Sequence, residues 1–300
     1  MVWGLMALGV YITYRLLDFA DLTVDGSLAT GGAVAVMLIR GGMSPWAALI
    51  FAFLAGMAAG FITGILHTAL GIPGILASIL TQISLYSINL NIMGCSNQAV
   101  SVDKYPLVVS LRYLSDSNST RVQIFATCIL FCFAIVAILY WYFGTEQGSA
   151  LRATGSNPAM SRAQGINIDR MKVIGLALSN GVVALSGGLM TQFQGTADVN
   201  MGRGAIVIGL ASIVIGEVFC EAIFKKGCNF SVKLLFIVLG GVLYYMVMTL
   251  ILWLRLDPND LKLFTALIVA LFLAVPYLQK QSKSSFSRAK KRGQKEAIGQ

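Results

Sequence analysis

The chain has 300 residues, of which 57% are hydrophobic and 12% are charged, and its formal net charge at pH 7 is +9. Such a composition is too apolar for an ordinary soluble domain. It predicts an all-α fold, a polytopic transmembrane helical bundle, because the apolar runs are too long and continuous for the strands of a membrane barrel.

Nine apolar runs are long enough to cross the hydrocarbon core of a bilayer, which is about 30 Å thick. In chain order they are residues 1–18, 27–43, 46–66, 73–92, 121–143, 171–194, 204–224, 232–254 and 261–278. The second run is short and follows a polar stretch, so eight or ten crossings also fit the pattern. We expect residues 1–278 to form the membrane domain, with a cytoplasmic loop at 148–170, and residues 279–300 to form a tail.

The polar stretch DFADLTVDGS, residues 18–27, precedes the second run. Gly26 permits an unusual turn among side chains whose oxygens can accept hydrogen bonds from free backbone amides, namely Asp21, Thr23, Asp25 and Ser27. We therefore predict a helix interruption here. Interruptions at membrane depth occur where they line a cavity or are buried in protein, so these four residues are candidates for a translocation pathway. A simple cytoplasmic turn is the alternative.

The third run carries small residues at four-residue spacing, Ala52, Gly56, Gly60 and Gly64. Small side chains on one stripe let two helices approach closely in a membrane, where lipid provides no hydrophobic drive for association. The pattern predicts a helix–helix contact inside the bundle.

Two later runs contain more uncharged polar residues than contact with lipid would allow. In the fourth run, Gln82, Tyr86 and Asn89 share one helical face, and the sixth run contains Asn180 and Gln192. These five are also pathway candidates. They suit a neutral or zwitterionic polar solute better than a bare ion, whereas hydrogen bonding between helices is the alternative interpretation.

The segment Gly148–Lys172 is a short basic interruption between apolar runs. Asn157 is a good N-cap, Pro158 fits the first helical position, and Gly165 is placed to end a helix after two turns. We predict an independent short helix that is too small to fold alone. It would either lie in a groove of another protein or remain an undocked turn at the membrane surface.

This predicted helix presents a small apolar face formed by Ala159, Met160 and Ala163. Arg152 and Arg162 are available to acidic neighbours.

Two acidic residues, Glu217 and Glu221, lie one helical turn apart near the end of the seventh run. An ionisable group near the bilayer centre costs roughly 2.5 to 3.5 kcal/mol and is usually functional. Glu217 is therefore a pathway candidate, with a structural cap or an interhelical hydrogen bond as the alternative.

The sequence contains no pattern for catalysis or metal binding. His67 is the single histidine and has no acidic residue near it in the sequence, the five cysteines form no CxxC pair, and no phosphate-binding loop of the Walker type is present. We expect no catalytic, cofactor-binding or metal site, so energy must come from a gradient or from another subunit.

Basic residues indicate the orientation, because cytoplasmic loops carry an excess of Lys and Arg. If Gly148–Lys172 is cytoplasmic, two further crossings return the chain to Lys225 and Lys226, and two more lead to the basic tail. The amino terminus then lies outside. The longest external connection, Gly94–Thr120, would be a lid, a docking surface for an external partner, or an ordinary solvated loop.

The tail is basic from Lys280 to Lys295, with Glu296 as its only acidic residue. We expect it to lie near the anionic headgroups of membrane lipid rather than to bind nucleic acid.

The sequence GSALRATGSNPAMSRAQGINIDRMK, followed by VIGLALSNGVVALSGGL, resembles the coupling loop and next helix of permease subunits in ABC importers. The similar group includes the branched-chain amino acid and ribose permeases. DLTVDGS and IGLASIVIGE resemble a smaller subgroup assigned to tryptophan or other aromatic amino acids. The resemblance extends over about residues 5–278. The larger ribose-type permeases have an additional amino-terminal span, which we do not expect in this chain.

The resemblance implies a bacterial-type cytoplasmic membrane protein that works as a homodimer or as a pair of like permeases. Separate ATPase subunits would hold ATP and Mg²⁺, and an extracytoplasmic binding protein would deliver the solute. Residues 157–165 would be the coupling helix, preceded by a lead-in at 148–155. ATP-driven closure of the ATPases would move this helix and rock the spans between outward-open and inward-open states.

The interpretation is the translocation subunit of an importer for an amino acid, with tryptophan and other aromatic amino acids among the candidate substrates. A sugar or nucleoside permease of the same group is an alternative. A gradient-driven carrier or channel and a membrane scaffold without transport activity are the rivals from other classes.

Overall fold

The computed structural model describes residues 1–100, 107–109, 118–224 and 229–253, together with residues 263, 266, 267, 270 and 274. The chain divides into two compact units, Met1–Val242 and Leu243–Gln300. The predicted all-α class is confirmed. The helices are α1 (Val2–Tyr11), a π-helix η1 (Ile12–Leu16), α2 (Thr23–Arg40), α3 (Pro45–Thr68), α4 (Gly74–Met93), α6 (Asn118–Gly144), α7 (Glu146–Ser156), α8 (Pro158–Ala163), α9 (Ile168–Gln194), α10 (Ala205–Ile223) and α11 (Phe230–Trp253).

Within the described residues, six helices are long and apolar enough to cross a membrane, namely α3, α4, α6, α9, α10 and α11. Each coincides with one predicted run. The first run corresponds to a shorter apolar segment, Val2–Leu16. The second corresponds to α2, which has 18 residues but is not one of the six. The predicted ninth run, 261–278, lies mostly outside the described residues.

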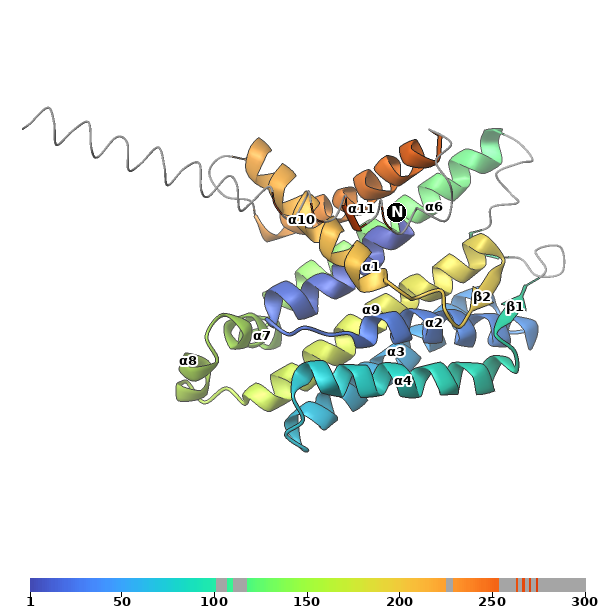
Figure 1. Ribbon diagram of the computed structural model, residues 1–300. Coiled ribbons are helices and arrows are strands. Elements are labelled where there is room, and N and C mark those ends of the chain that lie inside the picture. Colours follow the sequence, from blue (N-terminus) through green and yellow to red (C-terminus); the bar gives the residue numbers. More distant parts are fainter. Residues whose placement is uncertain are drawn as a thin grey trace, which may run out of the picture. The chain divides into compact units, whose positions relative to one another are not determined.

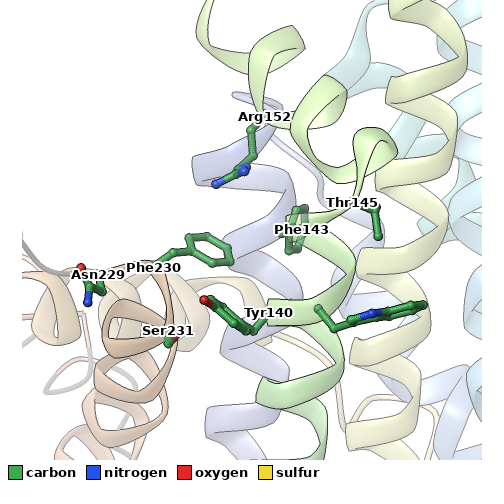
Figure 2. A pocket seen from close by; sticks show the side chains of 9 residues that line it. Tyr140, Phe143, Thr145, Arg152, Asn229, Phe230 and Ser231 are labelled. Carbon is green, nitrogen blue, oxygen red and sulfur yellow. The ribbon is translucent and has the colours of Figure 1, made fainter.

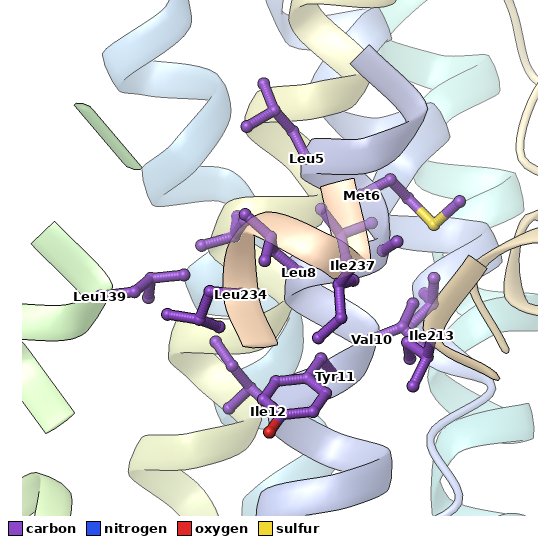
Figure 3. Close-up of a cluster of buried hydrophobic side chains, with 14 of the residues drawn as sticks. Leu5, Met6, Leu8, Val10, Tyr11, Ile12, Leu139, Ile213, Leu234 and Ile237 are labelled. Carbon is purple, nitrogen blue, oxygen red and sulfur yellow. The ribbon is translucent and has the colours of Figure 1, made fainter. Parts of the chain in front are cut away.

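The first apolar segment lies at the centre of the larger unit. Residues 4–13 of α1 and η1 are all buried, and α1 packs against α9, α10 and α6. Figure 3 shows Leu8 and Ile12 of this segment close to Leu234 of α11 and Leu139 of α6. Protein therefore surrounds this short helix on every side, which explains why its sequence is apolar all round.

The small-residue stripe of α3 packs directly on α9. A Cβ atom added at Gly56 or Gly60 would collide with the α9 backbone at Asn180 or Leu176, and one at Gly64 would lie 2.9 Å from Cα of Val173. Ala52 is fully buried beside this contact. The predicted helix–helix contact inside the bundle is confirmed.

A helix break lies before α2, as predicted, but it is shorter than the polar stretch. The break covers residues 17–22, and α2 begins at Thr23. Gly26 is therefore a helical residue, and the prediction of an unusual turn at this glycine is wrong. Its missing side chain instead allows a close contact between helices, because a Cβ atom there would lie 3.3 Å from Cα of Gln82 in α4.

Two short strands were not predicted. β1 (Asn97–Ala99) pairs in antiparallel fashion with β2 (Thr196–Asp198), with Gln98 opposite Ala197. They bring the carboxyl ends of α4 and α9 together, and Figure 1 shows them at the end of the larger unit opposite α7 and α8.

Candidate functional site

A polar cavity of about 280 Å³ lies between the start of α2, the middle and later part of α4 and the segment after β2. Its lining consists of Asp25, Gly26, Gln82, Ile83, Tyr86, Asn89, Val199 and Arg203. The structure thus brings four predicted pathway residues, one from α2 and three from α4, around one cavity. These α4 residues share a face because spacings of four and three residues return to the same side of a helix.

The carboxylate of Asp25 joins the cavity to α10. Its Oδ2 accepts a hydrogen bond from the backbone N–H of Gly204 at 3.0 Å, and its Oδ1 accepts one from Ile206 at 3.0 Å. These amides belong to the first turn of α10, whose partial positive charge favours an anion. Gly202 allows this approach, because a Cβ atom there would collide with the backbone of Asp25.

Asn89 lines the cavity, and its side-chain amide makes no hydrogen bond within the described part of the chain. Its side chain is fully buried, yet neither Nδ2 nor Oδ1 has a hydrogen-bond partner. A buried polar group left without a partner costs about 1 to 3 kcal/mol, so such groups are rare in folded proteins. The structure therefore leaves a buried amide on a cavity-lining residue without the partners that such groups usually have.

A second group of predicted residues forms a closed hydrogen-bond network with one side chain at its centre. Asn180 Nδ2 donates to Asp21 Oδ2 at 2.7 Å, and Asn180 Oδ1 accepts from Ser27 Oγ at 2.6 Å. Asp21 Oδ1 also accepts from the backbone N–H of Thr23, whose hydroxyl lies 2.9 Å from that of Thr63. These side chains are buried, and they link α2, α3 and α9 rather than lining the cavity.

The last two predicted pathway residues lie elsewhere. Gln192 is buried and holds neighbouring segments together, since its Oε1 accepts from the Val108 N–H at 3.1 Å and its Nε2 donates to the Pro45 carbonyl at 3.4 Å. Glu217 forms an ion pair with Arg15, Nε to Oε1 at 2.8 Å. Neither residue lines the polar cavity.

The segment from Asn157 to Gly165 has the local structure that the sequence predicts. Asn157 caps α8 by accepting a hydrogen bond from the Met160 N–H at 3.0 Å, and Pro158 occupies the first turn. The helix ends at Ala163, and Gly165 has a φ of 83°, which favours glycine. Three residues of α8 are exposed and apolar, namely Ala159, Met160 and Ala163, and Arg162 is exposed beside them.

Gly155 and Arg152 lie on α7, away from the exposed face of α8. A Cβ atom at Gly155 would collide with the Leu16 carbonyl, so this glycine lets α7 pack against the end of η1. Arg152 lies over the ring of Phe230, 5.4 Å from its centroid. Both residues therefore join α7 to the bundle.

Arg152 is one of the residues that line a larger cavity of about 670 Å³ (Figure 2). Figure 2 shows Arg152 pointing towards Phe230, with Tyr140 and Phe143 of α6 nearby. No predicted pathway residue lines this cavity, so the smaller polar cavity is the candidate site for a solute.

Sequence reasoning did not identify Ile83 of α4 as a contributor to the polar cavity, nor two residues of another segment, Val199 and Arg203. Both come from the segment that β2 positions, and the pairing of β1 with β2 is a contact between segments about 100 residues apart in the sequence. The polar residues of α4 indicated a candidate pathway face, but they gave no information about the segment that lies opposite this helix across the cavity.

Residues 1–276 match the family described as "Branched-chain amino acid transport system / permease component". The chain belongs to this permease family. The resemblance indicated by the coupling-loop residues is thereby confirmed. The permease is a component of an ABC-type transport system, and its apolar helices are consistent with a multi-pass protein of the inner membrane.

Individual relatives differ in what they transport. The permease is 39% identical over 274 residues to the tyrosine transport system permease protein of Clostridioides difficile (strain R20291), covering 91% of the permease and 88% of that relative. It is 35% identical over 272 residues to an uncharacterized protein of Rickettsia prowazekii (strain Madrid E), with 90% and 92% covered.

A more distant relative is the ribose import permease protein RbsC of Haemophilus influenzae (strain ATCC 51907 / DSM 11121 / KW20 / Rd). It is 24% identical over 201 residues, which cover 65% of the permease and 59% of that protein. No solved structure matches the permease.

Proposed function

We propose that the permease forms the solute pathway of an ABC importer for an amino acid, with tyrosine or another aromatic amino acid as the leading substrate. The observation that carries this proposal is a capped helix, α8, whose apolar face is exposed at the end of the unit opposite β1 and β2 (Figure 1). Such a helix suits a groove in a partner protein, as in helix-in-groove recognition. A separate ATPase would supply that groove.

Force on α8 has a direct route into the bundle. α8 follows α7 after a single residue, Asn157, and Gly155 of α7 packs against the backbone of Leu16. The next residue, Leu17, packs against α9 at Gly175, where a Cβ atom would collide with its side chain. A displacement of α8 therefore reaches both the central segment α1–η1 and the long helix α9. Packed helices transmit such displacements because their interiors are dense.

The remaining parts of the proposal concern the assembly. ATP and Mg²⁺ belong to the ATPase subunits, and this chain holds no cofactor of its own. Two copies of the permease form the pathway, and an extracytoplasmic binding protein delivers the solute. The chain crosses the membrane about nine times, with the amino terminus outside and the tail in the cytoplasm. The excess of basic residues in the segments placed inside supports this orientation.

Association with the ATPase provides the test. Ala159→Glu or Ala163→Glu places a charged side chain on the exposed face of α8, and we expect each variant to lose association with the ATPase in a pull-down from detergent. Ser149→Glu is the matched control, because Ser149 is exposed on α7 outside that face. Equal recovery of the ATPase with all three variants would contradict the role of α8.

A further inference from the structure

We propose that the polar cavity between α2, α4 and residues 199–203 is a selectivity site that recognises both charged groups of a free α-amino acid. This inference rests on the proposed function and adds the residues that distinguish an amino acid from a sugar. Asn89 contacts the solute, Asp25 attracts its ammonium group, and Arg203 attracts its carboxylate.

The strongest indication of a ligand is Asn89 itself. Its amide has a donor and an acceptor, both buried and both without a partner, and the residue lines the polar cavity. A helix of a membrane protein could place an apolar residue here at no cost to packing. The polar amide is explained if a solute with both an acceptor and a donor completes its hydrogen bonds.

The charges at the cavity have opposite signs. The Asp25 oxygens accept backbone hydrogen bonds from the start of α10, and the two carboxylate oxygens together have about four acceptor sites. Arg203 is exposed at the cavity and forms no ion pair with any residue that the structure describes. A site with one fixed anion and one fixed cation repels neither end of a zwitterion, whereas a lone cation or anion meets a like charge.

The size and the remaining walls also fit a small amphiphilic solute. The volume of about 280 Å³ lies just below the lower end of the usual range for ligand pockets, which is about 300 to 1,000 Å³. Ile83 and Tyr86 provide apolar and aromatic surface next to the polar groups. An aromatic side chain of the solute would pack against them, since aromatic rings attract one another in offset or edge-to-face arrangements.

Asn89→Leu separates a binding role from a structural one. Because the substitution removes an unpartnered amide while keeping a similar volume, we expect thermal unfolding of the full-length permease at an unchanged or higher temperature. We also expect binding of L-tyrosine to fall by roughly tenfold or more, as for the loss of hydrogen bonds to a charged ligand. Asn91→Leu is the matched control, since Asn91 is exposed on the same helix and does not line the cavity.

Binding is measured on the permease and its ATPase in nanodiscs, with the extracytoplasmic binding protein left out so that it cannot select the solute. The probes are L-tyrosine, tyramine, 3-(4-hydroxyphenyl)propionate and D-ribose. The wild type should prefer L-tyrosine over each of the others. Arg203→Gln should reduce the preference for L-tyrosine over tyramine, which lacks the carboxylate, and leave the preference over 3-(4-hydroxyphenyl)propionate unchanged.

Some outcomes would overturn the inference and leave the importer function standing. These are equal binding by the Asn89→Leu and Asn91→Leu variants, tighter binding of D-ribose than of L-tyrosine, and no binding of any probe by a wild type that takes up amino acid when ATP and the binding protein are supplied. A wild type that takes up no solute under those full conditions would contradict the proposed function itself.

Discussion

Asn180 lies at the centre of the buried hydrogen-bond network that links α2, α3 and α9. It donates to a carboxylate on the break before α2, accepts from a hydroxyl on α2, and donates to the Leu176 carbonyl at 3.0 Å in its own helix. Burial of the Asp21 carboxylate without these partners would be costly, because the protein interior solvates charge poorly. The network therefore fixes the start of α2, next to Asp25 and the polar cavity.

Asn180→Ala removes the side-chain donor to Asp21 Oδ2, and we expect it to lower the free energy of unfolding by about 1.5 to 3 kcal/mol, as for hydrogen bonds to charged groups. Ser179→Ala is the comparison, because the Ser179 hydroxyl donates to the neutral Gly9 carbonyl at 2.7 Å. Its loss should cost about 0.5 to 1.5 kcal/mol. Reversible unfolding in mixed micelles measures both, and equal losses would contradict the importance assigned to the buried carboxylate.

The sequence predicted the conformation of a residue correctly where that conformation depends on neighbouring residues in the chain. Asn157 caps α8 through an amide three residues away, and Gly165 adopts a positive φ directly after that helix. Partners far apart in the sequence could not be predicted. Asp25 caps a helix about 180 residues later, and Arg15 pairs with Glu217 across 202 positions. Nothing in either local sequence indicates such a partner.

At the scale of elements, the contact of α3 with α9 organises the larger unit. Gly56 and Gly60 lie against the α9 backbone, and the same stretch of α9 carries Asn180. The stripe was predictable because its four-residue spacing repeats on one helix face. The position of α2 was not, because its sequence gives little sign that it is buried on nearly all sides, from Thr23 to Ile39.

Gly60→Leu should destabilise the bundle by about 1 to 3 kcal/mol or more, because an added side chain forces the two helices apart. Ala58→Leu is the matched control. Ala58 is exposed and lies on a different side of α3, since two residues correspond to roughly 200° of rotation. Thermal unfolding of the two purified variants in detergent measures the difference. A control as unstable as Gly60→Leu would contradict the packing assigned to this stripe.

At the scale of the whole molecule, α9 connects the two proposed sites. It has 27 residues, about 40 Å at 1.5 Å per residue, and it begins three residues after Gly165. It ends beside β2, the strand that leads into Val199 and Arg203 at the polar cavity. One continuous helix thus extends from the proposed coupling segment to the segment that lines the cavity, and Asn180 connects its middle to α2 through hydrogen bonds.

The most direct measurement is uptake of labelled L-tyrosine into proteoliposomes that contain the permease, its ATPase and the extracytoplasmic binding protein. The account predicts accumulation against a gradient only when the ATPase and ATP are both present, and no accumulation when Ala159→Glu replaces the wild type. Uptake at the same rate without the ATPase would contradict it and indicate a carrier or channel. Absence of any solute flux with every partner supplied would indicate a scaffold.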